Sequence, residues 1–177
     1  MTSYRIRPFD RAVDVASFRC GQTLLDEYIR RYASQDVHRN VARVFIATPD
    51  RDSRQLAGFF TLSAGGVSCS DLPESLAKKL PRYPVPVALI GRLAVATDFQ
   101  GKGLGSILLA DACQKVANAS EMLAVVGIVV DAKDAAAISF YRHFGFLPLP
   151  HQPARLLLPV PWKEAKHPVY SRCRDID

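Results

Sequence analysis

The chain has 177 residues, of which 49% are hydrophobic and 23% are charged, so its composition is that of a folded protein and excludes a disordered one. Basic residues outnumber acidic ones by 23 to 17, which gives a net charge of +6, and sixteen of the basic residues are arginine. This length predicts one domain over residues 1–177, and the arginine excess hints at phosphate-bearing partners, because guanidinium grips phosphate with a planar fork.

The cysteines and histidines show no spacing typical of a metal or redox site, so we expect no metal. The four cysteines are Cys20, Cys69, Cys113 and Cys173. Scattered thiols of this kind fit the reducing cytosol. The longest apolar run, Leu123 to Val130, is far shorter than the roughly 20 residues of a bilayer span. Because the first ten residues also lack the apolar core of a signal peptide, the sequence predicts a cytoplasmic protein.

The first part of the chain predicts an edge strand, a helix and a hairpin. Tyr4 to Phe9 alternates as a strand does, and apolar residues recur at helical spacing from Thr23 to about His38. Val44 to Ala47 and Leu56 to Cys69 are predicted strands. A polar turn separates these two strands, so we expect them to pair as a hairpin.

A proline-rich stretch divides the chain near its middle. A short helix is predicted over Pro73 to Leu80, with Ser70 or Asp71 as its cap. Pro81 to Pro86 contains three prolines and cannot be helical. It leads into Val87 to Val95, which is predicted to be a buried strand.

The remaining elements alternate between helix and strand. We expect a helix from about Gly103 to Ala119, a strand over Leu123 to Asp131, and a helix over Asp134 to Phe144 that Gly145 stops. Arg155 to Val160 is predicted to be a last strand. A single α/β domain with a mixed sheet accounts for this order of elements.

The segment Gln100 to Ser106, Gln-Gly-Lys-Gly-Leu-Gly-Ser, lies between a predicted strand and a predicted helix. Glycines let the main chain turn and let a ligand approach it closely, and N–H groups at a helix start attract anions. The segment therefore predicts a phosphate or pyrophosphate site. It does not end in the GK[ST] of a P-loop, and Ser106 stands where a dinucleotide fingerprint needs glycine.

The same segment matches the acetyl-CoA signature Q/R-x-x-G-x-G/A at Gln100, Gly103 and Gly105. A second mark is the Phe-Tyr-x-x-x-Gly-Phe ending that starts at Phe140 and closes at Phe146. On these marks the chain resembles the GNAT acetyltransferases. The resemblance implies a single GNAT acyl-CoA N-acyltransferase fold of the α/β (α+β) class, with a mixed, mostly antiparallel sheet and flanking helices.

The resemblance also implies where acetyl-CoA, the co-substrate, would bind and how it would react. A main-chain N–H near Leu93 to Val95 would polarise the thioester oxygen, and Tyr141 would protonate the leaving thiolate. The unperturbed pKa of tyrosine, about 10, keeps it protonated at neutral pH. The implied coenzyme contacts are Leu93, Ala94, Val95, Gln100, Gly101, Lys102, Gly103, Leu104, Gly105, Ser106, Asp131 and Phe140. The other interpretation of Tyr141 is a packing aromatic among neighbouring phenylalanines.

The predicted strand Val87 to Val95 leads into the acetyl-CoA signature, and between Val87 and Leu93 it carries no carboxylate that could act as a base toward a protonated amine. A free α-amino group titrates at about 7.7–8.0, well below lysine at about 10.4, and an ester lowers its pKa further. This absence favours an α-amino ester as the acceptor.

Nearly the whole chain resembles the GNAT toxins of type II toxin–antitoxin systems. The marks include Phe18 to Gly21, Gly58 to Ala64, Leu80 to Pro86, Leu89 to Val95 and Val129 to Lys133. The resemblance implies acetylation of the amino acid on charged tRNA, which stops translation. It also implies a ribbon-helix-helix antitoxin, contact with DNA only through that antitoxin, and a homodimer. The tail, Trp162 to Asp177, is longer than the family core requires.

On this interpretation four arginines are candidates for contacts with the tRNA backbone: Arg82, Arg92, Arg30 and Arg31. The sequence also allows a GNAT that acetylates a protein N-terminus or a small amine, and an inactive GNAT that serves as a binding module or co-repressor. It does not specify which aminoacyl-tRNA is acetylated.

Overall fold

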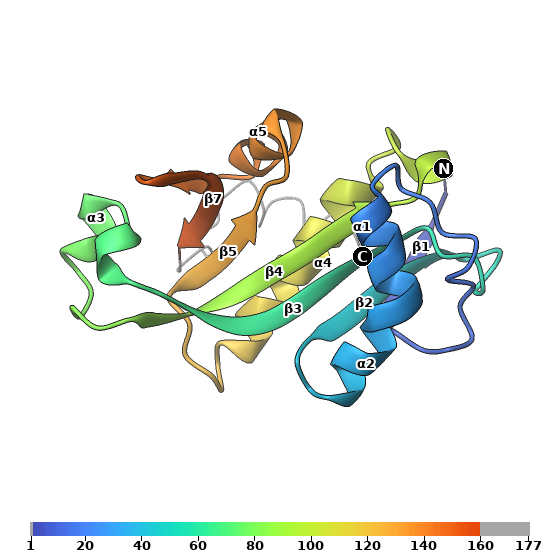
Figure 1. Cartoon of the computed structure of the whole chain (residues 1–177), viewed down its shortest axis with the longest axis horizontal. Coiled ribbons are helices and arrows are strands. Elements are labelled where there is room, and N and C mark those ends of the chain that lie inside the picture. The colour runs from blue at the N-terminus through green and yellow to red at the C-terminus, as the bar shows by residue number, and fades with distance from the viewer. Residues whose placement is uncertain (1, 160–177) are drawn as a thin grey trace. The chain divides into compact units, whose positions relative to one another are not determined.

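The computed structural model of the chain describes residues 2–159 (Figure 1). Val160, the tail from Trp162 and Cys173 therefore lie outside the described residues. The described residues divide into two compact units, one made of the chain up to Ser63 with Gly91–Ala112 and the other of Ala64–Ile90 with the described residues from Cys113 onward. The single domain over residues 1–177 stays a prediction.

Seven strands form one sheet in the order β1-β2-β3-β4-β5-β7-β6. Strands β4 and β5 are parallel, whereas β1–β2, β2–β3, β5–β7 and β6–β7 are antiparallel, which confirms the mixed sheet. The strands are β1 Tyr4–Pro8, β2 Arg43–Pro49, β3 Gly58–Val67, β4 Val85–Val95, β5 Gly127–Asp131, β6 Leu147–Leu149 and β7 Gln152–Pro159. Strands β3 and β4 run through both units.

The helical elements agree with most of the predicted ones. They are α1 Thr23–Glu27, the π-helical turn η1 Tyr28–Tyr32, α2 Ala33–His38, the 3-10 turns η2 Cys69–Asp71 and η3 Thr97–Phe99, α3 Glu74–Ala77, α4 Leu104–Ala119 and α5 Ala135–His143. The helix predicted from Thr23 to His38 is thus interrupted by one wide turn. Within the described residues, no helix has both the length and the apolar composition of a bilayer span.

In the first unit, helices pack on both faces of the sheet because successive strand residues point to opposite sides. A Cβ on Gly58 would lie 2.9 Å from Leu108 of α4, so this face of β3 is covered by α4. The next residue, Phe59, packs against Phe18 and stacks on Tyr28 of η1. The sheet of this unit therefore lies between α4 and the helical segment α1–η1–α2.

The second unit has its own apolar core. Its buried members are Val67, Leu72, Val85, Val87, Val129, Leu149 and Leu157, and Leu76 and Ala77 of α3 pack against them. Gly127 begins β5 where a Cβ would come within 2.5 Å of the Leu158 carbonyl oxygen, so only glycine allows this approach of β5 to β7.

Three local predictions were wrong. Ser70 and Asp71 do not cap α3, because they form their own turn η2 and Pro73 stands at the cap position. Strand β5 begins at Gly127 and not at Leu123, which is 66% exposed. Strand β6 was missed, since three residues with a proline in the middle give no periodic signal.

Candidate functional site

The predicted anion site begins with two glycines in the left-handed region of the backbone. Gly101 has φ +71° and Gly103 has φ +85°, values that side chains disfavour. The ladder of α4 starts with the bonds that the Ser106 and Ile107 N–H groups donate to the Gly103 carbonyl, at 3.1 and 3.2 Å. The amides just before Ser106 are the unpaired donors that every helix start leaves, and they can cradle an anion.

Side chains in this loop mostly contact other residues of the protein. The Lys102 ammonium donates to the Asp98 carbonyl at 2.7 Å and lies over the Phe99 ring. Leu104 is buried, whereas Gly105 is half-buried, as is Ser106. A phosphate would therefore meet mainly main-chain N–H groups here.

The end of β4 lies beyond its ladder with β5 and close to the main chain of β3. The ladder between β4 and β5 contains Ala88–Ile90, so Leu93 and Val95 lie beyond it and are half-buried. The Ala94 carbonyl oxygen would be 2.8 Å from a Cβ on Gly58, which explains the glycine at that position of β3.

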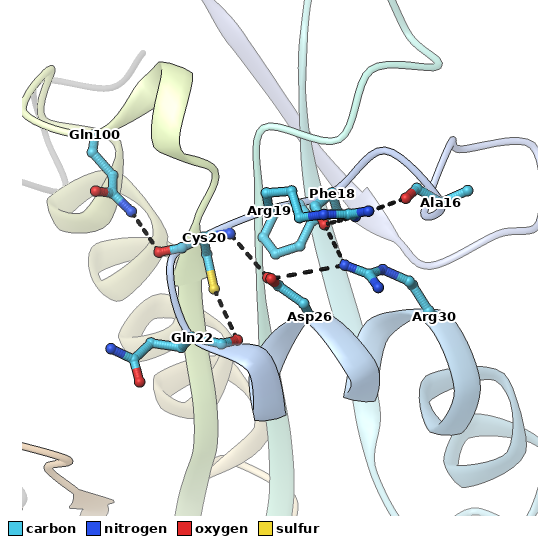
Figure 2. A network of polar contacts seen from close by, with 8 residues as sticks. All are labelled: Ala16, Phe18, Arg19, Cys20, Gln22, Asp26, Arg30 and Gln100. Atoms are coloured by element: carbon cyan, nitrogen blue, oxygen red, sulfur yellow. Dashed lines mark hydrogen bonds and ion pairs between the residues drawn. The ribbon is translucent and has the colours of Figure 1, made fainter.

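Gln100 occupies the first position of the signature, but its side chain is turned toward the protein (Figure 2). Its Nε2 donates to the Cys20 carbonyl and to the Val95 carbonyl, each at 2.9 Å. An amide nitrogen has two protons, so both are used. The coenzyme contact predicted for Gln100 stays a prediction, and the structure gives its amide nitrogen these internal partners.

Tyr141 lies in the second unit, on α5, where it is 8% exposed. Its ring contacts Phe140 and Phe146 at centroid distances of 5.2 and 5.5 Å. Burial, with a smaller contribution from Cys113, raises the pKa of Tyr141 to about 12. No residue in the described part of the chain forms a hydrogen bond with its hydroxyl. At neutral pH Tyr141 is thus a protonated phenol, and within residues 2–159 its hydroxyl donates to no other residue.

Arg92 stacks on a buried tyrosine in the first unit. Its guanidinium carbon lies 3.7 Å from the centroid of the Tyr28 ring. The Tyr28 hydroxyl donates to Asp36 Oδ2 at 3.0 Å, which fixes the ring. Burial, together with this hydrogen bond and the negative charge of Asp36, raises the pKa of Tyr28 to about 12. The face of the Tyr28 ring attracts the cation and leaves the guanidinium its hydrogen-bond donors, which can meet an anion.

The other three candidate arginines differ in exposure. Arg31 and Arg82 are exposed. Arg30 is turned inward, where its Nη2 donates to the Phe18 carbonyl at 2.9 Å and lies 3.7 Å from Asp26 (Figure 2). The Arg30 side chain, which is 28% exposed, is thus engaged in an internal network, and its contact with the tRNA backbone stays a prediction.

Two further candidates for coenzyme contacts have partners in the second unit. Asp131 accepts two hydrogen bonds from the Arg155 guanidinium, at 2.8 and 3.2 Å. Phe140 is half-buried against Tyr141 and Phe144. Among residues 2–159, no group of three histidine, cysteine, aspartate or glutamate side chains is arranged to hold a metal ion.

Sequence reasoning missed three residues that organise the first unit: Asp26, Tyr28 and Asp36. A signal for Asp26 existed, since it precedes Ile29 by three residues and Ala33 by seven, and both of these are buried. A carboxylate on the buried stripe of a helix indicates a specific polar partner. Asp36 gave no such signal.

The chain is similar to proteins of known family and fold. Residues 19–146 match the family described as "Acetyltransferase (GNAT) family". The tRNA-acetylating toxin of Mycobacterium tuberculosis is 38% identical over 152 residues, which are 86% of this chain and 89% of that protein.

Solved structures are also similar. AtaT complexed with acetyl-methionyl-tRNAfMet has a TM-score of 0.83 and 28% identity, with 89% of this chain and 95% of that chain covered. A tyrosine-to-phenylalanine mutant of AtaT, bound to the C-terminus of the antitoxin AtaR and to acetyl-CoA, has a TM-score of 0.74 and 26% identity. That comparison covers 89% of this chain and 93% of the other.

Proposed function

The chain belongs to the GNAT acetyltransferase family, and we propose that it transfers an acetyl group from acetyl-CoA to the α-amino group of the amino acid on charged tRNA, which blocks translation. The observation that carries this proposal is the start of α4, where left-handed Gly101 and Gly103 present main-chain amides suited to a pyrophosphate. The named activity of the 38% identical relative supports tRNA as the acceptor.

In the proposed reaction the amine nitrogen attacks the thioester carbon, a C–N bond forms and the C–S bond breaks. The main chain of Leu93 to Val95 binds the pantetheine arm and polarises the thioester oxygen. Tyr141 gives its proton to the departing thiolate, and the attacking nitrogen loses one to water. The pKa of about 12 supports this role, because the phenol is fully protonated wherever the amine is free to attack.

The proposed acceptor follows from the absence of a base. No carboxylate occurs along β4, Val85–Val95, and this favours an acceptor amine that loses its own proton near neutral pH. An α-amino ester does so more readily than lysine. We assign the tRNA backbone to Arg31, Arg82 and Arg92 and leave Arg30 out, because its guanidinium donates to the Phe18 carbonyl.

The proposed partners follow from the relatives and from the toxin resemblance. AtaT binds the C-terminus of the antitoxin AtaR together with acetyl-CoA, and we propose that an antitoxin, of ribbon-helix-helix type, holds this chain in the same way. A homodimer in the cytosol, with DNA reached only through the antitoxin, completes the proposal.

The test uses purified protein, acetyl-CoA and a set of charged tRNAs, with free amino acids, an N-terminal peptide and a polyamine as competing acceptors. We expect acetylated aminoacyl-tRNA as the main product and inhibition of cell-free translation that depends on acetyl-CoA. Acetylation of the peptide or polyamine in preference to tRNA would reject the proposed acceptor. Absence of any transfer, with acetyl-CoA still bound, would favour a binding module.

A further inference from the structure

A short segment of main chain, Phe18–Gly21, is bonded to the coenzyme loop at two successive carbonyls. The Arg19 carbonyl accepts from the Thr97 N–H at 2.8 Å, and the Cys20 carbonyl accepts from Gln100 Nε2 at 2.9 Å. We call Phe18–Gly21 the strap. It fixes the residues that lead from β4 into the loop.

The strap is also bonded to helix α1. The Cys20 N–H donates to Asp26 Oδ1 at 2.9 Å, and the Asp26 side chain is only 10% exposed (Figure 2). Arg30 lies 3.7 Å from the other carboxylate oxygen and donates to the Phe18 carbonyl. Burial of a carboxylate is costly unless it is paired and hydrogen-bonded, so this arrangement holds Cys20 in one place.

The chain of contacts therefore runs from Asp26 through the Cys20 peptide to Gln100. From Gln100 it reaches the Val95 carbonyl, which is the end of β4. Cys20 and Gln100 are 80 residues apart, so this bond is a tertiary link and not a local turn. Both ends of the proposed coenzyme site, the strand end and the loop, meet at one amide group.

We propose that Asp26 and Gln100 are positioning residues for acetyl-CoA, which place the amides of the loop at Gly101 to Gly105 through the strap. The inference rests on the proposed function, since it takes this loop to be the coenzyme site. Preorganised donors must be held to within roughly 0.5 Å to bind well. Asp26 affects the coenzyme from α1 although its carboxylate is bonded to the Cys20 N–H and not to the loop.

The experiment measures the dissociation constant of acetyl-CoA by calorimetry for Gln100→Ala, Asp26→Ala and the double variant. Each single change should weaken binding roughly tenfold, since Asp26→Ala removes one hydrogen bond to the strap and Gln100→Ala removes two from the loop. The double variant should be little worse than either single one, because both break the same chain of contacts. Full multiplication of the two effects, or unchanged affinity, would overturn the proposal.

Two matched controls separate positioning from general damage. Gln114→Ala removes an exposed amide that bonds Asn118 on the same helix α4, and Glu74→Gln removes a carboxylate from an exposed ion pair. Both should bind acetyl-CoA as the parent chain does. A loss of the same size in either control would contradict the assignment.

A second pair of variants keeps the test informative if the alanine variants fold poorly. Gln100→Arg retains N–H donors for both carbonyls and should keep the affinity, whereas Gln100→Glu removes them at similar volume and should lose it. Equal behaviour of the two would overturn the proposal. Because these assays need no acceptor, their failure is distinguishable from a failure of tRNA acetylation, and the affinity of the parent chain tests the coenzyme site itself.

Discussion

Two buried tyrosines, Tyr28 in the first unit and Tyr141 in the second, have the same raised pKa of about 12 but very different surroundings. The Tyr28 hydroxyl donates to Asp36, and its ring lies under the Arg92 guanidinium. Tyr141 is packed among phenylalanines, and no described residue hydrogen-bonds its hydroxyl.

A raised pKa therefore does not by itself identify a general acid. Burial is the largest cause of the raised pKa in both tyrosines, so the value reflects the loss of contact with water and not a catalytic role. What separates the two is whether the proton has a partner. The Tyr28 hydroxyl donates its proton to Asp36, whereas no described residue accepts a hydrogen bond from Tyr141, as its proposed role as a general acid requires.

The largest expected effect is on kcat, when the hydroxyls of Tyr141 and Tyr28 are removed in separate variants. Tyr141→Phe should lower kcat by roughly 10²–10⁴-fold, the usual contribution of a general acid, with the affinity for acetyl-CoA unchanged. Tyr28→Phe should lower kcat by less than roughly tenfold, since it removes one internal hydrogen bond. Comparable losses in both variants, measured in single-turnover assays, would remove the distinction between the two tyrosines.

The pH dependence of kcat/KM tests the proposed role of Tyr141 as the general acid. We expect kcat/KM to rise about tenfold per pH unit up to the pKa of the acceptor amine, which the ester holds below the roughly 7.7–8.0 of a free α-amino group, and then to stay level. A general acid loses activity only above its own pKa, and that of Tyr141 is about 12, so no fall should occur below pH 10. A falling limb between pH 8 and 9, read from initial rates at constant ionic strength, would assign the proton to another group.

Alkaline unfolding compares the two tyrosines without reference to catalysis. An unfolded tyrosine ionises near pH 10 and these two near pH 12, so the unfolded state releases protons first. The contribution of each tyrosine to stability is therefore constant below pH 10 and falls between pH 10 and 12, as the unfolded state loses its protons first. Either phenylalanine variant should flatten this slope in urea titrations, and a slope unchanged by both would contradict the shared cause.

The smallest effect concerns the ring of Tyr28. Tyr28→Leu removes the platform under Arg92 and should raise KM for charged tRNA roughly two- to fivefold, as expected for a partly exposed cation–π contact. Tyr28→Phe keeps the ring and should leave this KM near that of the parent chain. KM for acetyl-CoA is the internal control, and an equal rise in both constants would indicate a general loss of folding.

The parts of the site that the sequence predicted are those encoded locally. Gly101 and Gly103 have no side chain, so a turn with positive φ is expected from the sequence. The helix α4 after them follows from the periodic spacing of its apolar residues. The bond from Gln100 to Cys20 joins residues 80 positions apart, so no local pattern contains it. The hydrogen bond from Arg30 to the Phe18 carbonyl could not be predicted for the same reason. The local sequence around a helical arginine is the same whether its guanidinium faces solvent or bonds a carbonyl elsewhere in the chain.

The wide turn Tyr28–Tyr32 sets the rotational phase of the N-terminal helix. The Ala33 N–H bonds to the Tyr28 carbonyl five residues back, one residue more than an α-helix uses. Residues five apart in a regular α-helix are about 140° apart around its axis. Because this turn is wide, Tyr28 and Ala33 lie one turn apart, and both are buried, so the helix keeps a buried face across the turn although the sequence carries an additional residue there.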